Sequence, residues 1–466
     1  MKTFRVRDHR SSLLVATLSS AFGVVLLMVT SSLAVVIEAD DVTGSSGTVV
    51  IMLAIAAAIF VSIAIYVSAI VTANTFATIV AGRTRTIALL RLIGSSARTQ
   101  RKSFATEGMV VGMLGGAAGL VFGLLAAAGF TQLGVALGSL PSLDYPLITP
   151  TVVLPVAAVV LTTWLASWIG ARRVLTVTPM QAIAGSQELS REESTARPGR
   201  NATAIVLFSL GVLLLVAGVA VGLVSPFGVL IGIVGGIVSF TGLVIGAHLV
   251  MPPALRLVGH WFGSSAPAKL AAENAVRYPE RSSRTTIGLV IGVTLITMFA
   301  VAAASFQQFI EGARAAQPEV YEGIDTVLNI TVGVFSALIG LSALIAAVGM
   351  VNNLSLSVLQ RTRELGLLRA LGFSAKQVRR MILLESAQLT TAAVLVGLVL
   401  GIFYGWAGAQ SMFGAINGSP GLIVPAVPWL VVGIIVVLAA VLTAAAAVTP
   451  SRRATRIAPV AALAVD

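Results

Sequence analysis

Side chains that commonly perform chemistry are scarce in this sequence of 466 residues. It has no cysteine, three histidines, and 18 aspartates and glutamates. Cysteine nucleophiles, thiolate metal sites and disulfides are therefore excluded. A P-loop needs the pattern G-x₄-G-K-[ST], and none of the four lysines follows a glycine. We expect a chain that is not an enzyme and that holds no metal or cofactor of its own.

The most distinctive chemical groups are the guanidinium groups of two basic segments that resemble each other. Residues 83–107 and 361–385 align without gaps and are identical at 11 of 25 positions. Chance matches arise easily in apolar spans but not in charged segments, so this similarity indicates an internal duplication. Further matches flank this pair of segments. At the same separation in sequence, Gly119 matches Gly397 and Gly123 matches Gly401. At a slightly larger separation, Arg172-Arg173 and Pro179 match Arg452-Arg453 and Pro459, and at a smaller one Arg10-Ser11-Ser12 matches Arg281-Ser282-Ser283 more weakly.

Each basic segment has the pattern of an amphipathic helix that lies along the membrane surface. In residues 83–102 and 361–380, leucine and isoleucine alternate with arginine at helical spacing. Gly94 and Gly372 are expected to end these helices. Ser96 and Ser374 are expected to cap the N-termini of the helices that follow. The segments either only fix the topology or form two equivalent surfaces that dock on a two-fold symmetric partner.

The elements that position these segments are membrane helices. Hydrophobic residues make up 57% of the chain and charged residues 10%, with a mean hydropathy of +0.98, whereas soluble domains carry about 25% charged residues. Runs of about twenty apolar residues cross a bilayer as helix. Ten such runs predict an all-α integral membrane protein: 13–37, 49–76, 104–130, 151–170, 203–223, 227–251, 285–305, 327–352, 381–408 and 425–448.

The basic residues give these spans an orientation. With ten spans, 29 of the 30 lysines and arginines fall on one side of the membrane. The positive-inside rule then places both termini in the cytoplasm. The net charge of +12 and the pI near 11.1 reflect this topology, and we expect no nucleic-acid partner. Ser32-Leu33-Ala34 resembles a signal cleavage site, but its apolar run is too long, so we expect the first span to be retained.

The duplication divides the chain into four parts. Two four-helix modules at 1–184 and 253–466 are expected to share one orientation, because an even number of spans separates them. A polar cytoplasmic linker at 185–202 and a helix pair at 203–252 connect the modules. The proline pair Pro252-Pro253 is expected to end the last helix of this pair.

The stretch R-T-R-E-L-G-L-L-R-A-L-G at 361–372 resembles the signature of FtsX-like permeases. These are the membrane subunits of type VII ABC transporters, which include the MacB, LolC and bacitracin-resistance groups. The family pattern continues in both copies, as Glu385-Gly397-Gly401 with Arg452-Arg453-Pro459-Ala462-Leu463, and as Glu107-Gly119-Gly123 with Arg172-Arg173-Pro179-Ala182-Ile183. The ten-helix plan is similar to that of bacitracin-resistance permeases, without their large extracellular domain.

The resemblance implies that both basic segments are coupling helices, which insert into a separate ATPase subunit. That subunit, expected to be a homodimer, would bind ATP and Mg²⁺. The residues that the family pattern assigns to coupling are Arg83, Arg85, Leu89, Leu90, Arg91, Gly94, Arg361, Arg363, Glu364, Leu367, Leu368, Arg369 and Gly372. The implied function is ATP-driven export or extraction of an amphiphilic or hydrophobic substrate at the bacterial cytoplasmic membrane, such as a lipid, a peptide antibiotic or a drug.

Several residues inside or near the spans have structural and functional interpretations. Glu107 and Glu385 are expected at helix starts, where an acid interacts favourably with the helix dipole; a proton relay and a hinge are the alternatives. Small-residue faces that allow close helix contact are expected at Gly108, Gly112 and Gly116, at Gly119 and Gly123, and at Gly397 and Gly401. His248 is expected to be a packed polar residue.

Two other functions are compatible with a duplicated membrane protein. A secondary transporter would need ionisable residues near the membrane midplane, and none is expected among the acidic and basic residues. A mechanotransmission subunit that controls an envelope partner would need an extracellular contact surface, but the outer loops are short. A membrane-embedded hydrolase ranks below both because the spans lack catalytic residue types.

Overall fold

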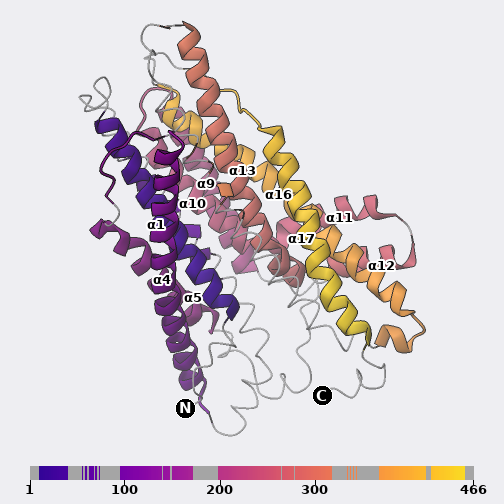
Figure 1. Cartoon of the computed structure of the whole chain (residues 1–466). Helices are drawn as coiled ribbons and strands as arrows, with labels where there is room; N and C mark the ends of the chain where they lie inside the picture. The colour runs from indigo at the N-terminus through magenta and orange to yellow at the C-terminus, as the bar shows by residue number, and fades with distance from the viewer. Residues whose placement is uncertain are drawn as a thin grey trace. The chain divides into compact units, whose positions relative to one another are not determined.

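The computed structural model describes most of the chain. Described are residues 10–39, 95–171, 198–316, 367–415 and 421–456, except for a few single positions within them. Isolated residues between 55 and 73 and between 318 and 343 are described as well. Within this described part the regular secondary structure is helical throughout, as predicted (Figure 1).

Within the described ranges, ten α-helices and two short 3₁₀-helices have defined bounds. The long helices are α1 (Arg10–Glu38), α4 (Ala97–Ala136), α5 (Val153–Gly170), α9 (Pro198–Gly222), α10 (Gly228–Ile245), α13 (Pro279–Ala316), α16 (Ala375–Phe413) and α17 (Trp429–Arg456). The short elements are η2 (Pro150–Val152), α11 (Ala247–Gly259), η3 (His260–Phe262) and α12 (Ala266–Arg277).

Seven of the described helices are long and apolar enough to cross a membrane: α1, α4, α5, α9, α10, α13 and α16. The apolar stretch of α17 that is described, Trp429–Ala444, is shorter. Two predicted spans, 49–76 and 327–352, lie largely outside the described residues. The chain is therefore a multi-pass, all-helical membrane protein, and the count of ten spans stays a prediction.

Two helices are much longer than the spans predicted within them. α4 has 40 residues and α16 has 39, so at 1.5 Å per residue each is about 60 Å long. The hydrocarbon core of a bilayer is only about 30 Å thick. Each helix begins directly after its capping serine and continues into the apolar run, because no proline interrupts it. The basic residues at its start and the apolar residues of the span thus share one continuous helix.

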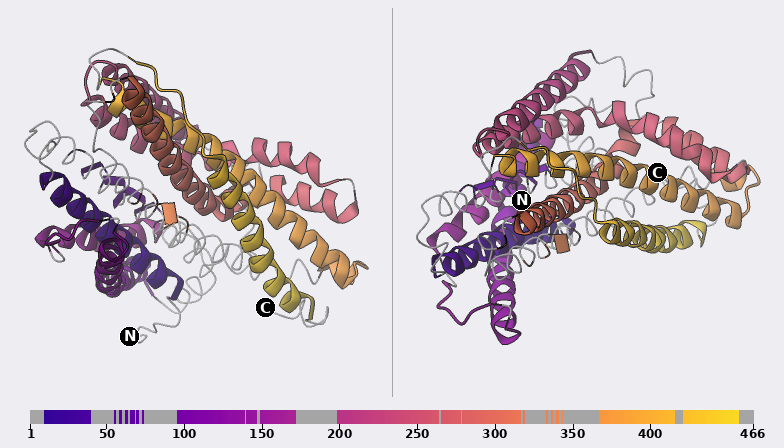
Figure 2. Two further views of the ribbon diagram at one scale, coloured as in Figure 1. Left: turned by 45° about the horizontal axis from the view of Figure 1, so that its top comes forward. Right: turned by 90° about the horizontal axis from the view of Figure 1, so that it is seen from above.

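The chain folds into two compact units. One comprises residues 1–186 and 303–345, and the other residues 187–302 and 346–466. In the first unit, α4 packs against both α1 and α5. In the second, α16 packs against α9, α10, α11, α12 and α17, and Figure 2 shows α11 and α12 as a pair of short helices beside it.

The predicted helix pair at 203–252 consists of α9 and α10, which approach each other through small residues. These residues recur every seven positions, as Ala204, Gly211 and Gly218 on α9 and Gly228, Gly235 and Gly242 on α10. A Cβ atom placed on Gly235 would lie 2.5 Å from the backbone nitrogen of Leu215. Backbone therefore contacts backbone, which side chains at these positions would prevent.

Two boundaries of this helix pair differ from the prediction. α9 begins at Pro198, inside the predicted linker, because proline is well suited to the first turn of a helix. α10 ends at Ile245, and α11 starts after Gly246 and contains Pro252 and Pro253 in its interior. The expectation that these prolines end a helix was wrong. The break falls at Gly246 instead, and Pro252 is buried in the packing of α11.

Candidate functional site

The described part of the second basic segment forms a helical turn that ends at Gly372. The Phe373 amide donates to the Leu368 carbonyl at 3.0 Å, and the Gly372 amide donates to the Arg369 carbonyl at 3.1 Å. Gly372 has φ +100°, a conformation that glycine adopts without strain. This is the Schellman arrangement, and it agrees with the helix stop that the sequence predicted here.

The serines that follow the basic segments cap α4 and α16. The Thr99 amide donates to Ser96 Oγ at 3.1 Å. At α16, the Gln377 amide donates to Ser374 Oγ at 3.2 Å, while the Ser374 amide donates to Gln377 Oε1 at 2.9 Å. The second pair is a complete capping box. Both predicted N-caps are confirmed, and only Phe373 and Ser374 separate Gly372 from α16.

An apolar cluster holds this turn against α12 and α16. Its buried members are Ala271 of α12 and Val378, Met381 and Ile382 of α16. Leu368 and Phe373 pack on the cluster from the turn itself, so Leu368 positions the segment.

Two leucines of the same turn lie on its exposed side. Leu367 is 51% exposed and Leu371 is 71% exposed. An exposed leucine that faces water gains free energy when a partner covers it. The turn therefore presents Leu367 and Leu371 as a small apolar surface, while Leu368 fixes it to the protein.

The other residues assigned to coupling are only partly described. Arg369 is half-buried. The remaining ones lie outside the described residues, and their role stays a prediction: Arg83, Arg85, Leu89, Leu90, Arg91, Gly94, Arg361, Arg363 and Glu364.

In the first unit, Arg101 of α4 is held by the end of α5. Its guanidinium carbon lies 3.8 Å from the centroid of the Trp168 ring, and its Nε donates to the Trp168 carbonyl at 3.3 Å. A cation is favourable both over an indole ring and at a helix C-terminus. This contact fixes the basic start of α4 to α5. Sequence reasoning noted Arg101 as a repeated position but missed its aromatic partner.

The glycines of α4 lie on two faces rather than one. Gly108, Gly112 and Gly116 face α5, where a Cβ atom on Gly112 would lie 3.1 Å from Val160 Cα. Gly115, Gly119 and Gly123 face α1, where a Cβ atom on Gly119 would lie 2.5 Å from the Thr17 carbonyl oxygen. α4 is thus in close contact with two helices at once.

The glycines of α16 make the corresponding contact with α13. A Cβ atom on Gly397 would lie 2.7 Å from Val293 Cβ, and one on Gly401 would lie 2.8 Å from the Thr294 carbonyl oxygen. Gly119 and Gly397 occupy the same position in the two repeat copies. Gly119 approaches Ser20 of α1, and Gly397 approaches Val293 of α13. α1 therefore corresponds to α13, with Ser20 aligned on Val293. The weak sequence match between the starts of these helices was therefore displaced by two positions.

A threonine pair occupies the matching position between α16 and α17. Thr390 Oγ1 and Thr443 Oγ1 share a hydrogen bond of 2.7 Å. At the corresponding place in the first unit, a Cβ atom on Gly112 would lie 3.2 Å from Thr163 Cβ. One copy thus uses a close glycine contact and the other a hydrogen bond. Either device joins the two helices without a hydrophobic driving force.

Glu107 and Glu385 do not lie at helix starts. α4 begins at Ala97 and α16 at Ala375, so both acids are three turns inside, and neither helix has an acid in its first turn. The helix dipole acts within about one turn of the end. The dipole interpretation was therefore wrong, because each helix begins at its capping serine, well before the acid. The predicted hinge role stays a prediction.

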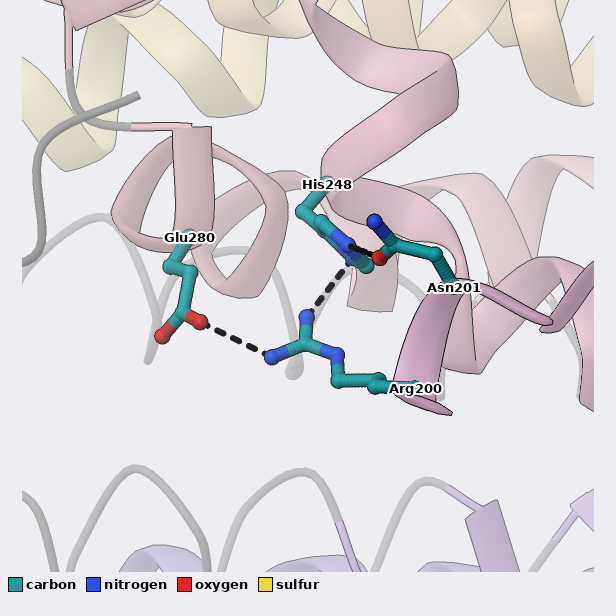
Figure 3. Close-up of polar contacts among 4 residues, drawn as sticks. All are labelled: Arg200, Asn201, His248 and Glu280. Atoms are coloured by element: carbon teal, nitrogen blue, oxygen red, sulfur yellow. Dashed lines mark hydrogen bonds and ion pairs between the residues drawn. The ribbon is translucent and has the colours of Figure 1, made fainter. Parts of the chain in front are cut away.

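Figure 3 shows a polar network in the second unit that joins α9, α11 and α13. Arg200 Nη1 donates to Glu280 Oε1 at 2.8 Å, and Arg200 Nη2 donates to His248 Nδ1 at 2.7 Å. His248 Nε2 lies 2.8 Å from Asn201 Oδ1. His248 and Glu280 are buried. The prediction of a packed polar histidine is confirmed, but its partners, 47 and 48 residues away, were missed.

The arginine decides which ring nitrogen of this histidine acts as the acceptor. A guanidinium group has no acceptor atom, so His248 Nδ1 must accept from Arg200. The ring proton then lies on Nε2 and is donated to Asn201. The network therefore places the imidazole of His248 between a cation and an amide. Across the described residues, histidine and the acids nowhere gather in a group of three that would suit a metal ion.

Comparison with known proteins agrees with this arrangement. The FtsX-like permease C-terminal family matches residues 58–179 and 336–459. The first residues of the two matches are separated in sequence by the same number of residues as Arg83 and Arg361. Their last residues are separated by the same number as Pro179 and Pro459, because they are these two prolines. Together they cover more than half of the chain.

Curated relatives match shorter stretches. The chain is 32% identical over 145 residues to the uncharacterized ABC transporter permease YknZ of Bacillus subtilis, covering 31% of this chain and 34% of the relative. It is 33% identical over 60 residues to the ABC transporter permease YtrF of the same species, covering 13% and 14%. It is 34% identical over 76 residues to the macrolide export ATP-binding/permease protein MacB of Chlorobaculum tepidum, covering 15% and 12%. The matched stretches span about a third or less of these relatives. Because this family matches the chain twice, at the separation of the chain's two repeats and over more than half of its length, the chain belongs to the FtsX-like permease family.

Proposed function

We propose that this chain is the membrane subunit of an ABC transporter driven by a separate ATP-binding homodimer. In this proposal ten helices cross the bacterial cytoplasmic membrane with both termini in the cytoplasm. The modules comprise residues 1–184 and 253–466, joined by the linker 185–202 and the helix pair 203–252. The twofold match to one permease family supports this arrangement.

The observation that carries the proposal is the division of roles within the turn before Gly372. Leu368 is packed against α12 and α16, whereas Leu367 and Leu371 are exposed. A loop that only fixes topology needs charge but no outward apolar surface. A docking segment needs both an attached side and a free side. The turn has both, which favours docking onto the ATPase.

The same geometry suggests how movement passes from the ATPase to the membrane. Closure of the ATP-bound homodimer would displace both coupling segments. At the second coupling segment, the Schellman turn, the capping box and the apolar cluster fix the segment to the start of α16. α16 then carries the displacement to Gly397 and Gly401, where contact with α13 through small residues permits sliding.

We propose an amphiphilic or hydrophobic cargo that enters from the bilayer. The spans are apolar, with exposed leucine, valine and phenylalanine along their length. The relative MacB is named for macrolide export, and export or extraction of a comparable amphiphile fits a chain whose described residues form mainly apolar helices.

The test is affinity purification of the full chain from its native host in mild detergent, with mass spectrometry of the bound proteins. The wild type is compared with Leu367→Asp/Leu371→Asp, and the control is Leu422→Asp, because Leu422 is 78% exposed and lies in the loop before α17. We expect an ATP-binding subunit with the wild type and the control, and its loss with the double variant. Absence of any ATPase from the crosslinked wild type would refute the proposal.

A further inference from the structure

The helix α11 has an unusual position in the chain. It follows the 18-residue apolar helix α10 after a single residue, Gly246. With 13 residues, α11 is about 20 Å long, too short to cross a hydrocarbon core of about 30 Å. The 3₁₀ turn η3 extends it by three residues.

One face of α11 is attached to α16. Met251, Leu255 and Val258 are buried on this face. Gln388 of α16, which is 1% exposed, donates from Nε2 to the Leu255 carbonyl at 3.0 Å. Because Gly259 has no side chain, the end of α11 can approach Gln388; a Cβ atom there would lie 2.6 Å from Nε2. α11 therefore cannot turn its other face inward.

A second face of α11, beside the buried one, is also apolar but exposed. Val250 is 38% exposed, and Leu257 and Trp261 are 62% exposed each. Steps of seven and four residues place the three side chains on one side of the helix. Arg256 and His260 are exposed along one edge of that side. An apolar strip with a tryptophan and a basic border is typical of a helix in the membrane interface.

We propose that α11 and η3 lie in the headgroup region of the bilayer, with Leu257 and Trp261 inserted and Arg256 directed at anionic lipid headgroups. Charge complementarity supports lipid as the occupant. On α12, the neighbouring helix, Lys269 is also exposed. The two positive charges of Arg256 and Lys269 exceed the one negative charge of the exposed Glu273. Basic residues at a membrane surface are attracted by the negative potential of anionic headgroups. The inference rests on the membrane nature of the chain and not on the ATPase, so either can fail alone.

The chain has no cysteine, so single-cysteine variants test this inference directly. Leu257→Cys and Trp261→Cys are spin-labelled in the full chain within nanodiscs of phosphatidylcholine and phosphatidylglycerol. Power saturation then compares how often the spin label collides with oxygen, which concentrates in lipid, and with a nickel chelate, which stays in water. The controls are Val399→Cys, 68% exposed within α16, and Glu273→Cys on α12.

We expect oxygen collisions to exceed nickel collisions at Leu257 and Trp261, with a depth between those of the two controls. Nickel excess at both positions would place the face in water, and exclusion of both reagents would mean that protein covers it. Either result overturns the inference. Arg256→Glu, and nanodiscs of phosphatidylcholine alone, are each expected to shift the label at Leu257 toward water. No shift in either would refute the role of anionic headgroups.

Discussion

The close contact between α9 and α10 makes opposite predictions for two adjacent glycines. A Cβ atom on Gly235 would lie 2.5 Å from the backbone nitrogen of Leu215 and 2.8 Å from the Gly211 carbonyl oxygen. A Cβ atom on Gly236 would meet nothing within 4 Å. Gly235→Ala therefore forces two backbones apart, whereas Gly236→Ala only adds a methyl group to open space.

The magnitude follows from these distances. Ordinary contact begins near 3.4 Å, so Gly235→Ala requires a separation of about 0.9 Å. A gap of that size removes about a quarter to a half of each dispersion contact between the helices, and overpacking typically costs about 1–3 kcal/mol. We expect a loss of about 2 kcal/mol in the free energy of unfolding. Gly236→Ala removes a glycine from a helix interior and is expected to gain up to about 1 kcal/mol.

The assay is reversible unfolding of the purified chain in mixed micelles by increasing sodium dodecyl sulfate, followed by circular dichroism. The midpoint should fall for Gly235→Ala and stay or rise for Gly236→Ala. Equal midpoints for the two variants, or a larger loss at Gly236, would show that α9 and α10 do not touch through their backbones.

Three further predictions concern other contacts. Leu367→Ala/Leu371→Ala should weaken binding of the ATPase about 60-fold in a titration against nanodiscs, because exposed fractions of 51% and 71% leave about 2.4 kcal/mol of burial to be gained. His248→Ala should lower the free energy of unfolding by about 2 kcal/mol in thermal denaturation, since it removes the hydrogen bonds that the imidazole makes with Arg200 and Asn201. Gln410→Ala should speed amide hydrogen exchange in the loop before α17, because it removes two hydrogen bonds of 2.6 and 2.8 Å to that loop.

Each has a matched control. Leu422→Ala should leave the affinity for the ATPase unchanged, and an unchanged affinity in the double leucine variant would contradict the docking surface. His260→Ala, at an exposed histidine, should leave the unfolding free energy near its wild-type value; equal losses at both histidines would argue against the network. Exchange that is faster along all of α16 after Gln410→Ala, rather than in the loop, would mean a general loss of fold.

Much of the helical architecture could be predicted because its signals are local. A run of twenty apolar residues leaves a chain in a bilayer no alternative to helix. Ser96 and Ser374 were recognisable as caps because each follows a glycine by two residues and precedes a helix. The repeat was visible because its charged residues are conspicuous in an apolar sequence.

The contacts between distant helices could not be predicted in the same way. Nothing near Arg101 indicates that Trp168 lies 3.8 Å away, since 67 residues separate them. Leu367 and Leu368 are adjacent leucines, and the positions of α12 and α16 decide which of the two is buried. The proline rule failed at Pro252 because a break at Gly246, well before it, had already ended the membrane helix.

The seven-residue spacing of the small residues on α9 and α10 also has a consequence for handedness. A contact line that repeats every seven residues on helices with 3.6 residues per turn winds the pair into a left-handed supercoil. α16 packs beside this coil, with Tyr404 bonded to Ser239 at 2.9 Å and Ser411 against Gly222. A shift of α16 along a left-handed groove would also carry it around the axis of the α9–α10 pair. The sense of that sideways movement would be set by the glycine spacing.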